Sequence, residues 1–237
     1  MDLRLKYVLG MGWLDDLVTD HDTYDDTDHT LYLVRSADAP NEVPSPTIRA
    51  GLRITQVGSF YESLTWNMLA SNAGNQADII SNNFALISDI NRQAVESAVG
   101  LWDITRLVCP LDDSVSKLEV IQSIYELLGM AMYKTVVEPD ADPVWMFLTT
   151  PTMKRLFEMS GIECTVLFAG HVTDTDDYDS FLCVARPRSA YMSVRNSHRT
   201  ATKRVLTRVL DGCNALQSQH LATTRASTAM PVVDAVR

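Results

Sequence analysis

The densest group of chemically active side chains is the run DHDTYDDTDH, residues 20–29. It does not fit a calcium loop, because Tyr24 stands where an oxygen ligand belongs and Asp25 stands where a turn glycine belongs. Carboxylates close to Trp13 and Tyr24 could instead bind an ammonium or sulfonium group by charge and cation–π attraction. The run is therefore either a solvated acidic loop or part of a pocket for a small cation.

A second candidate group is the segment WDITR, residues 102–106. It lies in an apolar stretch bounded by a glycine and a proline, which predicts a buried strand. Strand alternation places Asp103 and Thr105 on one face and the other three residues on the opposite face. A buried acid must be paired or used. Asp103 either forms a salt bridge with a base such as Arg53, or has a pKa raised by burial that suits it to accept a proton from an amine.

Two arginines in the predicted strands pose a related choice. Arg53 lies in GLRIT, and Arg106 ends the second candidate group. They either neutralise the acidic loop or help to form a site for an anionic or carboxylate group, and both roles are compatible. The sequence contains no GxGxxG, GxxxxGK[ST], GxSxG or HExxH motif, so the usual dinucleotide, nucleoside-triphosphate, serine-hydrolase and zincin sites are not indicated.

The elements that must position these side chains follow a mixed order of strands and helices. A hairpin precedes residue 100, and strands alternate with helices after it, which predicts an α/β (α+β) sandwich around one mixed sheet. We expect a loop at residues 71–78 between two short helices, and a helix cap at Asp113 or Ser114. The expected strands are 31–35, 48–57, 101–109, 143–150, 164–170 and 180–187, and the later helices are 114–136, 150–161 and about 197–217.

Composition limits the class of protein. The chain has 237 residues, 46% of them hydrophobic, and a net charge of −10, which argues against a nucleic-acid-coating protein. Residues 186–237 carry nine bases against two acids, so this end could meet an acidic partner. The four cysteines form no CxxC pair and are expected to be reduced core thiols. No stretch resembles a membrane span or a signal peptide, so we expect a cytoplasmic protein without membrane contact.

Taken in order, these segments resemble the acyl-homoserine-lactone synthases, the LuxI-type autoinducer synthases, whose fold is similar to the GNAT N-acyltransferases. The resemblance covers residues 3 to about 187 and includes the helical segment MKRLFEMSGIE. Each piece is weak alone, but the ordered set is specific. The matching pieces are Leu3-Arg4, Gly12-Trp13, Asp20-x-Asp22-x-Tyr24-Asp25, Tyr32-Leu33, Gly51-Leu52-Arg53 and Trp102-Asp103-Ile104-Thr105-Arg106.

The resemblance implies a GNAT-like three-layer sandwich and a chemistry. In the family, S-adenosylmethionine supplies the amine as a substrate, an acyl chain arrives on acyl carrier protein or coenzyme A, and lactonisation expels methylthioadenosine. Asp103 would take the place of the family's glutamate as the base, with Thr105 and Arg106 completing the strand. No metal or cofactor is implied. The expected S-adenosylmethionine site consists of Arg4, Trp13, Asp22, Asp25 and Arg53.

The sequence also suggests a contact with the carrier protein, a lining for the acyl chain and the limits of the domains. Lys154 and Arg155 either contact the acidic carrier protein or form a solvated helix face. Met130, Met132, Trp145, Phe147 and Leu156 either line the acyl chain or are plain core. We expect a synthase domain over 1–190, a basic helix over 191–217 and a disordered tail over 218–237.

Two alternatives stay open at this point. A long-chain N-acyl amino acid synthase would share the fold but acylate an ordinary amino acid, without releasing methylthioadenosine. A degenerate relative would bind ligand or carrier protein without turnover.

Overall fold

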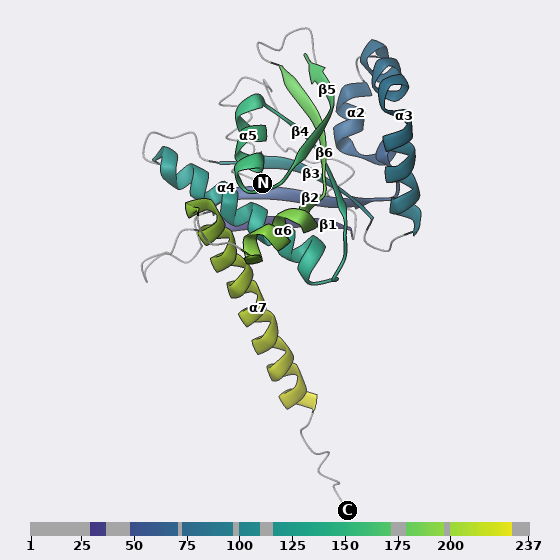
Figure 1. Ribbon diagram of the computed structural model, residues 1–237. Coiled ribbons are helices and arrows are strands. Elements are labelled where there is room, and N and C mark those ends of the chain that lie inside the picture. The colour runs from purple at the N-terminus through teal and green to yellow at the C-terminus, as the bar shows by residue number, and fades with distance from the viewer. Residues whose placement is uncertain are drawn as a thin grey trace, which may run out of the picture.

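The computed structural model describes residues 29–36, 48–70, 73–96, 100–109, 116–171, 179–196 and 200–228. Six strands form one sheet in the order β1-β2-β3-β4-β6-β5, and helices cover both of its faces (Figure 1). The predicted three-layer sandwich around a mixed central sheet is therefore confirmed. The strands are β1 (Thr30–Ser36), β2 (Ile48–Val57), β3 (Leu101–Val108), β4 (Val144–Thr149), β5 (Cys164–Gly170) and β6 (Ser180–Ala185).

The pairing within the sheet is antiparallel except between β3 and β4. The expected antiparallel neighbours β1 and β2 pair directly, from Thr30 opposite Thr55 onward. β3 and β4 are parallel and need a crossover, which the helix α4 (Lys117–Met132) supplies. In Figure 1 β1, β2 and β3 cross the molecule horizontally, whereas β4, β5 and β6 rise toward its top.

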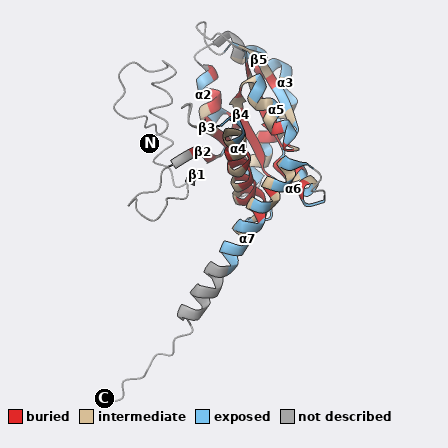
Figure 2. Cartoon of the chain, turned by 90° about the vertical axis from the view of Figure 1, so that its left-hand side faces the viewer, coloured by how far each residue is buried: buried red, intermediate tan, exposed pale blue. Residues whose placement is uncertain are grey.

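Strand alternation divides the core between two faces of the sheet (Figure 2). On one face Trp102, Ile104, Trp145 and Phe147 pack under α4, α5 (Pro151–Met159), α6 (Pro187–Asn196) and α7 (Ala201–Thr228). On the other face the core lies under α2 (Leu64–Ala70) and α3 (Ala73–Glu96). Its members from the sheet are Val57, Leu101, Val144, Met146, Leu167, Leu182 and Val184.

The region between residues 60 and 96 differs from the sequence prediction. A short 3-10 turn η1 (Phe60–Glu62) precedes α2, and α3 begins at Ala73, inside the predicted loop. The reason is packing, because Ile79, Ile87 and Ile90 of α3 bury against the sheet and hold polar neighbours in the helix.

One local break interrupts α3, beyond the predicted loop of residues 71–78. Asn83 has non-helical angles, and its side-chain amide donates to the carbonyl oxygens of Ile79 and Leu167, each at 3.0 Å. The second of these bonds joins the break to β5.

The ends of α4 and α5 test the predicted signals. Ser116, rather than Asp113 or Ser114, caps α4, and its hydroxyl accepts from the N–H of Glu119 at 3.2 Å. The cap is decided by which hydroxyl can accept from a free N–H of the first helical turn, and this position is held by Ser116. Pro151 begins α5 as expected, and Gly161 ends it with φ +90, a left-handed conformation that glycine adopts without strain.

The C-terminal region forms two helices where one was expected. α6 crosses residue 190 and buries Ala190 and Val194, and α7 crosses residue 217, so both expected domain boundaries fall inside helices. α7 also runs to Thr228, into the segment for which composition predicts disorder. No glycine or proline interrupts residues 213–228, which explains the continuation.

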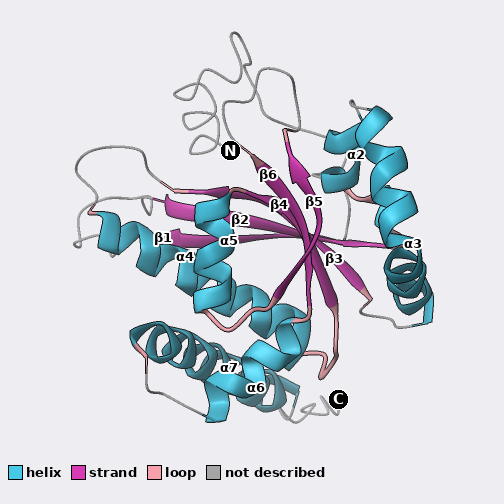
Figure 3. Cartoon of the chain, turned by 45° about the horizontal axis from the view of Figure 1, so that its top comes forward, coloured by secondary structure: helices cyan, strands magenta, loops and turns pink. Residues whose placement is uncertain are grey.

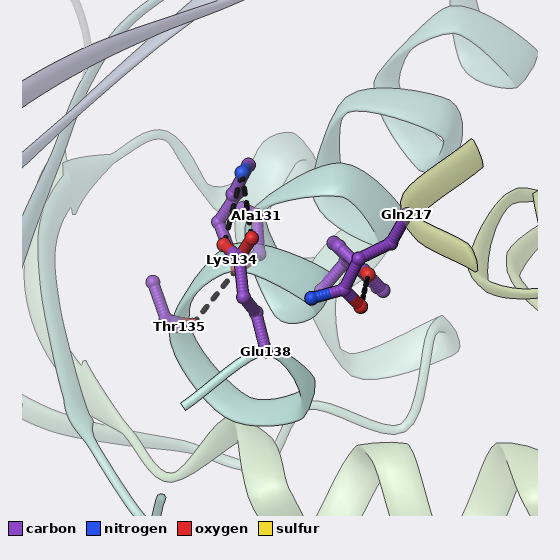
Figure 4. Close-up of polar contacts among 6 residues, drawn as sticks. Ala131, Lys134, Thr135, Glu138 and Gln217 are labelled. Atoms are coloured by element: carbon purple, nitrogen blue, oxygen red, sulfur yellow. Dashed lines mark hydrogen bonds and ion pairs between the residues drawn. The ribbon is translucent and has the colours of Figure 1, made fainter. Parts of the chain in front are cut away.

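A π-helical turn, η2 (Tyr133–Val137), follows α4 and anchors α7. The hydroxyl of Tyr133 donates to Gln217, and Leu206 and Leu210 of α7 are fully buried. Within the same turn Thr135 donates to the carbonyl of Ala131 at 2.9 Å, and Lys134 pairs with Glu138 at 2.9 Å (Figure 4). The first half of α7 is thus part of the core, while the helix continues away from the body in Figure 1.

Two helix glycines provide a matched test of the contact between α4 and α7. A Cβ on Gly129 would lie 3.0 Å from Cγ1 and 3.1 Å from Cβ of Val209, whereas one on Gly212 would meet nothing within 4 Å. Gly212→Ala is expected to raise the free energy of unfolding by about 0.5–1 kcal/mol, the usual helix preference for alanine.

The free energy of unfolding of Gly129→Ala is expected to be at least about 1 kcal/mol lower than that of Gly212→Ala, because overpacking against Val209 offsets the helix preference for alanine. Urea denaturation of both variants measures the difference. Equal gains at the two positions would show that the helices do not approach this closely.

Candidate active site

The parallel seam between β3 and β4 is short, and it ends at Asp103. Its ladder contains three residue pairs, of which Asp103 with Met146 is the last, although β3 continues to Val108 and β4 to Thr149. Beyond this pair the two strands run in different directions (Figure 3). Among the described residues, no residue of β3 beyond Asp103 pairs with β4.

A β-bulge lies in β3 just past that point. Gly51 and Arg53 of β2 pair with Val108 and Thr105, so three steps along β3 oppose two steps along β2. The extra residue is left out of the ladder and re-aims the local N–H and C=O groups, a device common beside active sites. The bulged part of β3 lies between Thr105 and Val108.

Asp103 is 1% exposed and binds the start of α2 with both carboxylate oxygens. The N–H of Thr65 donates to Oδ2 at 3.1 Å and its hydroxyl donates to Oδ1 at 2.5 Å. Burial raises the pKa of Asp103 to about 6, while the Thr65 bonds and the charge of Arg53 oppose that rise. At neutral pH the side chain is therefore a carboxylate with more than the usual affinity for a proton.

Two residues lie beside this carboxylate, Arg53 on β2 and Thr105 on β3 itself. Arg53 is 1% exposed, and its Nε donates to the hydroxyl of Thr105 at 3.0 Å. Asp103 and Thr105 share a face, as alternation predicts, and Trp102 and Ile104 lie on the opposite one. Of the two alternatives for Asp103, the structure favours the raised pKa: its hydrogen bonds come from Thr65 and from the N–H of Leu64, and Arg53 acts on it through its field.

The other predicted site residues are only partly visible. Arg4, Trp13, Asp22 and Asp25 lie outside the described residues, and of Arg106 only the backbone within β3 is described. Whether the acidic loop adjoins Asp103 is therefore still a prediction.

The predicted carrier contacts lie on α5. Lys154 is engaged by Glu158 at 2.5 Å, whereas Arg155 is exposed.

The residues expected to line an acyl chain belong to the packed core. Trp145 donates its indole N–H to Thr135 at 3.0 Å, and Phe147 stacks on Phe157 with ring centroids 4.5 Å apart. Two surface hollows, of about 300 and 390 Å³, lie elsewhere. Neither is lined by a predicted site residue. The linings are Gln93, Glu96, Gly100, Asp142 and Arg186 in the first, and Arg204, Thr207, Arg208 and Asp211 in the second.

Several expectations concern metals, thiols and membranes. The described residues contain no cluster of three or more metal-ligating side chains. The four cysteines are free thiols: Cys183 is buried in the core, and Cys109, Cys164 and Cys213 are partly buried and pack against it, as expected. None of the described helices combines the length and apolar character that a membrane crossing requires.

Sequence reasoning missed Thr65. It lies in the segment FYESLTWNML, in which only helical periodicity was visible. Nothing in its spacing marks a threonine that bonds a residue 38 positions away, since that contact depends on how α2 packs on the sheet.

Comparison with solved structures finds acyl-homoserine lactone synthases, the family that the sequence resembles. The chain is similar to TofI in complex with an inhibitor and MTA (15% identity, 80% of this chain and 85% of that chain, TM-score 0.48). It is also similar to the CoA-dependent synthase BjaI with SAM and isopentyl-CoA (15%, 88% and 80%, TM-score 0.49). A third similar structure is FeeM, an N-acyl amino acid synthase from uncultured soil microbes (12%, 81% and 90%, TM-score 0.46).

No family model and no curated protein matches the sequence. Because identities of this size do not transfer an activity, we derive the function from the residues of this chain.

The raised pKa of Asp103 predicts a pH dependence of stability. A carboxyl whose pKa rises from 3.8 to about 6 on folding stabilises the folded state below pH 4, and this contribution is lost as pH rises through 6. The change is about 3 kcal/mol at 1.4 kcal/mol per pKa unit. Relative to wild type, Asp103→Asn should therefore gain up to about 3 kcal/mol between pH 4 and 7.

Urea denaturation of both proteins across this pH range measures that difference, because all other groups contribute equally to both. Two curves that stay parallel from pH 4 to 7 would contradict the raised pKa.

Proposed function

We propose that this chain is an N-acyltransferase that acylates the amine of S-adenosylmethionine from an acyl thioester and makes an N-acyl-homoserine lactone. The observation that carries the proposal is a buried carboxylate with a pKa of about 6 at the last residue pair before β3 and β4 separate. A proton acceptor thus lies at the point where the pairing of these two strands ends. The ordered sequence resemblance supplies the identity of the substrates.

The proposed chemistry begins with the amine. An α-amino group has an ordinary pKa near 8, so at neutral pH a base must remove its proton before it can attack a carbonyl. Asp103 accepts that proton, through a water molecule because the carboxylate is buried. Raising the pKa of Asp103 by about two units brings it closer to the pKa of the amine, which favours the proton transfer.

The amine nitrogen then attacks the thioester carbonyl, and N–H groups of the bulge at residues 105–107 stabilise the oxyanion. The carbon–sulfur bond breaks, the thiolate leaves, the nitrogen loses its second proton to the thiolate, and the amide is complete. In the second step the carboxylate of the acylated product attacks the γ-carbon that bears the sulfonium. The bond to sulfur breaks, and neutral methylthioadenosine leaves as the lactone ring closes.

Binding of S-adenosylmethionine rests on charge. We assign its sulfonium and ammonium groups to Trp13, Asp22 and Asp25, which attract cations, and its carboxylate to Arg4 and Arg53. Arg53 supports this assignment because it is held rigidly by Thr105 beside the proposed base. Its guanidinium can present two parallel donors to a carboxylate.

The decisive experiment incubates the purified chain with S-adenosylmethionine and a panel of acyl thioesters on coenzyme A and on carrier protein. We expect an acylated lactone and methylthioadenosine in equal amounts, and mass spectrometry measures both products. Acylation of ordinary amino acids without methylthioadenosine would instead identify an N-acyl amino acid synthase. Ligand binding without any acylated product would identify a non-catalytic relative.

Asp103→Asn is expected to lower kcat at least about 100-fold, the usual contribution of a general base. Asparagine is nearly the same size and can still bond Thr65, so the dissociation constant of S-adenosylmethionine should change less than about threefold. Stopped assays and isothermal titration measure the two quantities. Undiminished turnover would remove Asp103 from the mechanism without removing the activity.

Carrier-protein contact is assigned to Arg155, which is exposed on α5, with Lys154 beside it. Arg155→Glu should raise KM for carrier-protein thioesters about tenfold by charge reversal against an acidic surface, and leave KM for coenzyme A thioesters unchanged. Arg208→Glu, an exposed charge reversal on α7, is the matched control. An equal effect of both variants, or none, would place the carrier elsewhere.

A further inference from the structure

Thr65 makes two hydrogen bonds to a single carboxylate. Its N–H and its hydroxyl each bond a different oxygen of Asp103, at 3.1 and 2.5 Å, and both side chains are 1% exposed. Two bonds from one residue, one to each oxygen, fix the plane of the carboxylate as well as its position.

Capping of α2 does not account for the second bond. Ser63 already accepts from the N–H of Trp66 at 3.0 Å, the ordinary cap of this helix start. The N–H of Thr65 also needs an acceptor, which Asp103 provides. The hydroxyl of Thr65 carries no such requirement of the helix, so its bond acts on the carboxylate.

The surroundings of Asp103 leave few other groups to control its ionisation. Opposite it on β2 is Thr55, whose hydroxyl bonds Thr30 at 3.0 Å, and beside it on β4 is Met146. Arg53 of β2 is the charged group among the described residues whose field lowers the pKa of Asp103. On α2 the facing groups are Thr65 and the N–H of Leu64, which are uncharged.

We propose that Thr65 is a positioning residue that holds Asp103 ionised and in a fixed orientation at the open end of the β3–β4 seam. The inference deepens the proposed function and rests on it for its catalytic consequence. Removing the hydroxyl leaves Oδ1 buried without its closest donor, which favours the protonated form of the carboxyl.

The test measures the ionisation of Asp103 without substrate. Protein labelled with carboxyl-¹³C aspartate is titrated by NMR, and Asp103→Asn assigns the resonance. Thr65→Val should raise the pKa of Asp103 by about one unit, a tenfold change in its ionisation constant. Thr65→Ser restores the hydroxyl and should return the pKa to within about 0.3 units, and Thr55→Val, which removes a neighbouring buried hydroxyl, should not move it.

A folded Thr65→Val protein with the wild-type pKa of Asp103 would overturn the inference. A double-mutant cycle gives a second measurement if this variant is unstable. The unfolding equilibrium constant should rise at least fivefold more on Thr65→Val in the wild-type background than in the Asp103→Asn background. Equal increases would also overturn it.

Enzyme kinetics separate this inference from the proposed function. In an active enzyme, Thr65→Val should move the acidic limb of the kcat/KM profile by the shift seen in the NMR titration, and Thr65→Ser should move it back. The pKa of Asp103 could shift as expected in a protein that makes no acylated product from any donor. That result would support the role of Thr65 and contradict the proposed acyl transfer. A shifted titration with an unshifted rate profile would overturn the catalytic consequence of Thr65.

Discussion

Burial of the Asp103 carboxylate is the constraint on which this structure depends. A charge removed from water costs several kcal/mol unless other groups bind it. Here the compensation comes from the start of α2 and from the field of Arg53. The position of α2 on the sheet and the chemistry of the site are thus one requirement, because the helix that covers this face also supplies the donors.

The balance is incomplete, and the proposed role of Asp103 as a base depends on this. Full compensation would keep the carboxyl at its ordinary pKa, and no compensation would leave it protonated at neutral pH. The two opposing effects leave it at about 6, where it is ionised in the cell's pH range but still a competent proton acceptor. Such a group is useful only where a substrate can reach it, and the separation of β3 from β4 begins at the same residue.

Much of the fold could be predicted from the sequence because its signals are local. An apolar stretch between a glycine and a proline identified β3, alternation gave the faces of Asp103 and Thr105, and Pro151 and Gly161 marked the limits of α5. Long-range effects could not be predicted. The start of α3 within a polar stretch, the bulge past Thr105 and the bond from Thr65 all depend on contacts between segments distant in sequence. Of the expected site, Arg53, Asp103 and Thr105 are brought together, whereas Arg4, Trp13, Asp22 and Asp25 are still predictions.

The brevity of the β3–β4 ladder also has a mechanical consequence. The sheet is effectively two antiparallel three-stranded units, β1-β2-β3 and β4-β6-β5, connected through three residue pairs. Rotation of one unit against the other is therefore resisted chiefly by the helices that lie across both, rather than by backbone hydrogen bonds. Amide protons at the end of this junction should exchange through small relative rotations of the two units, without the strands on either side unfolding.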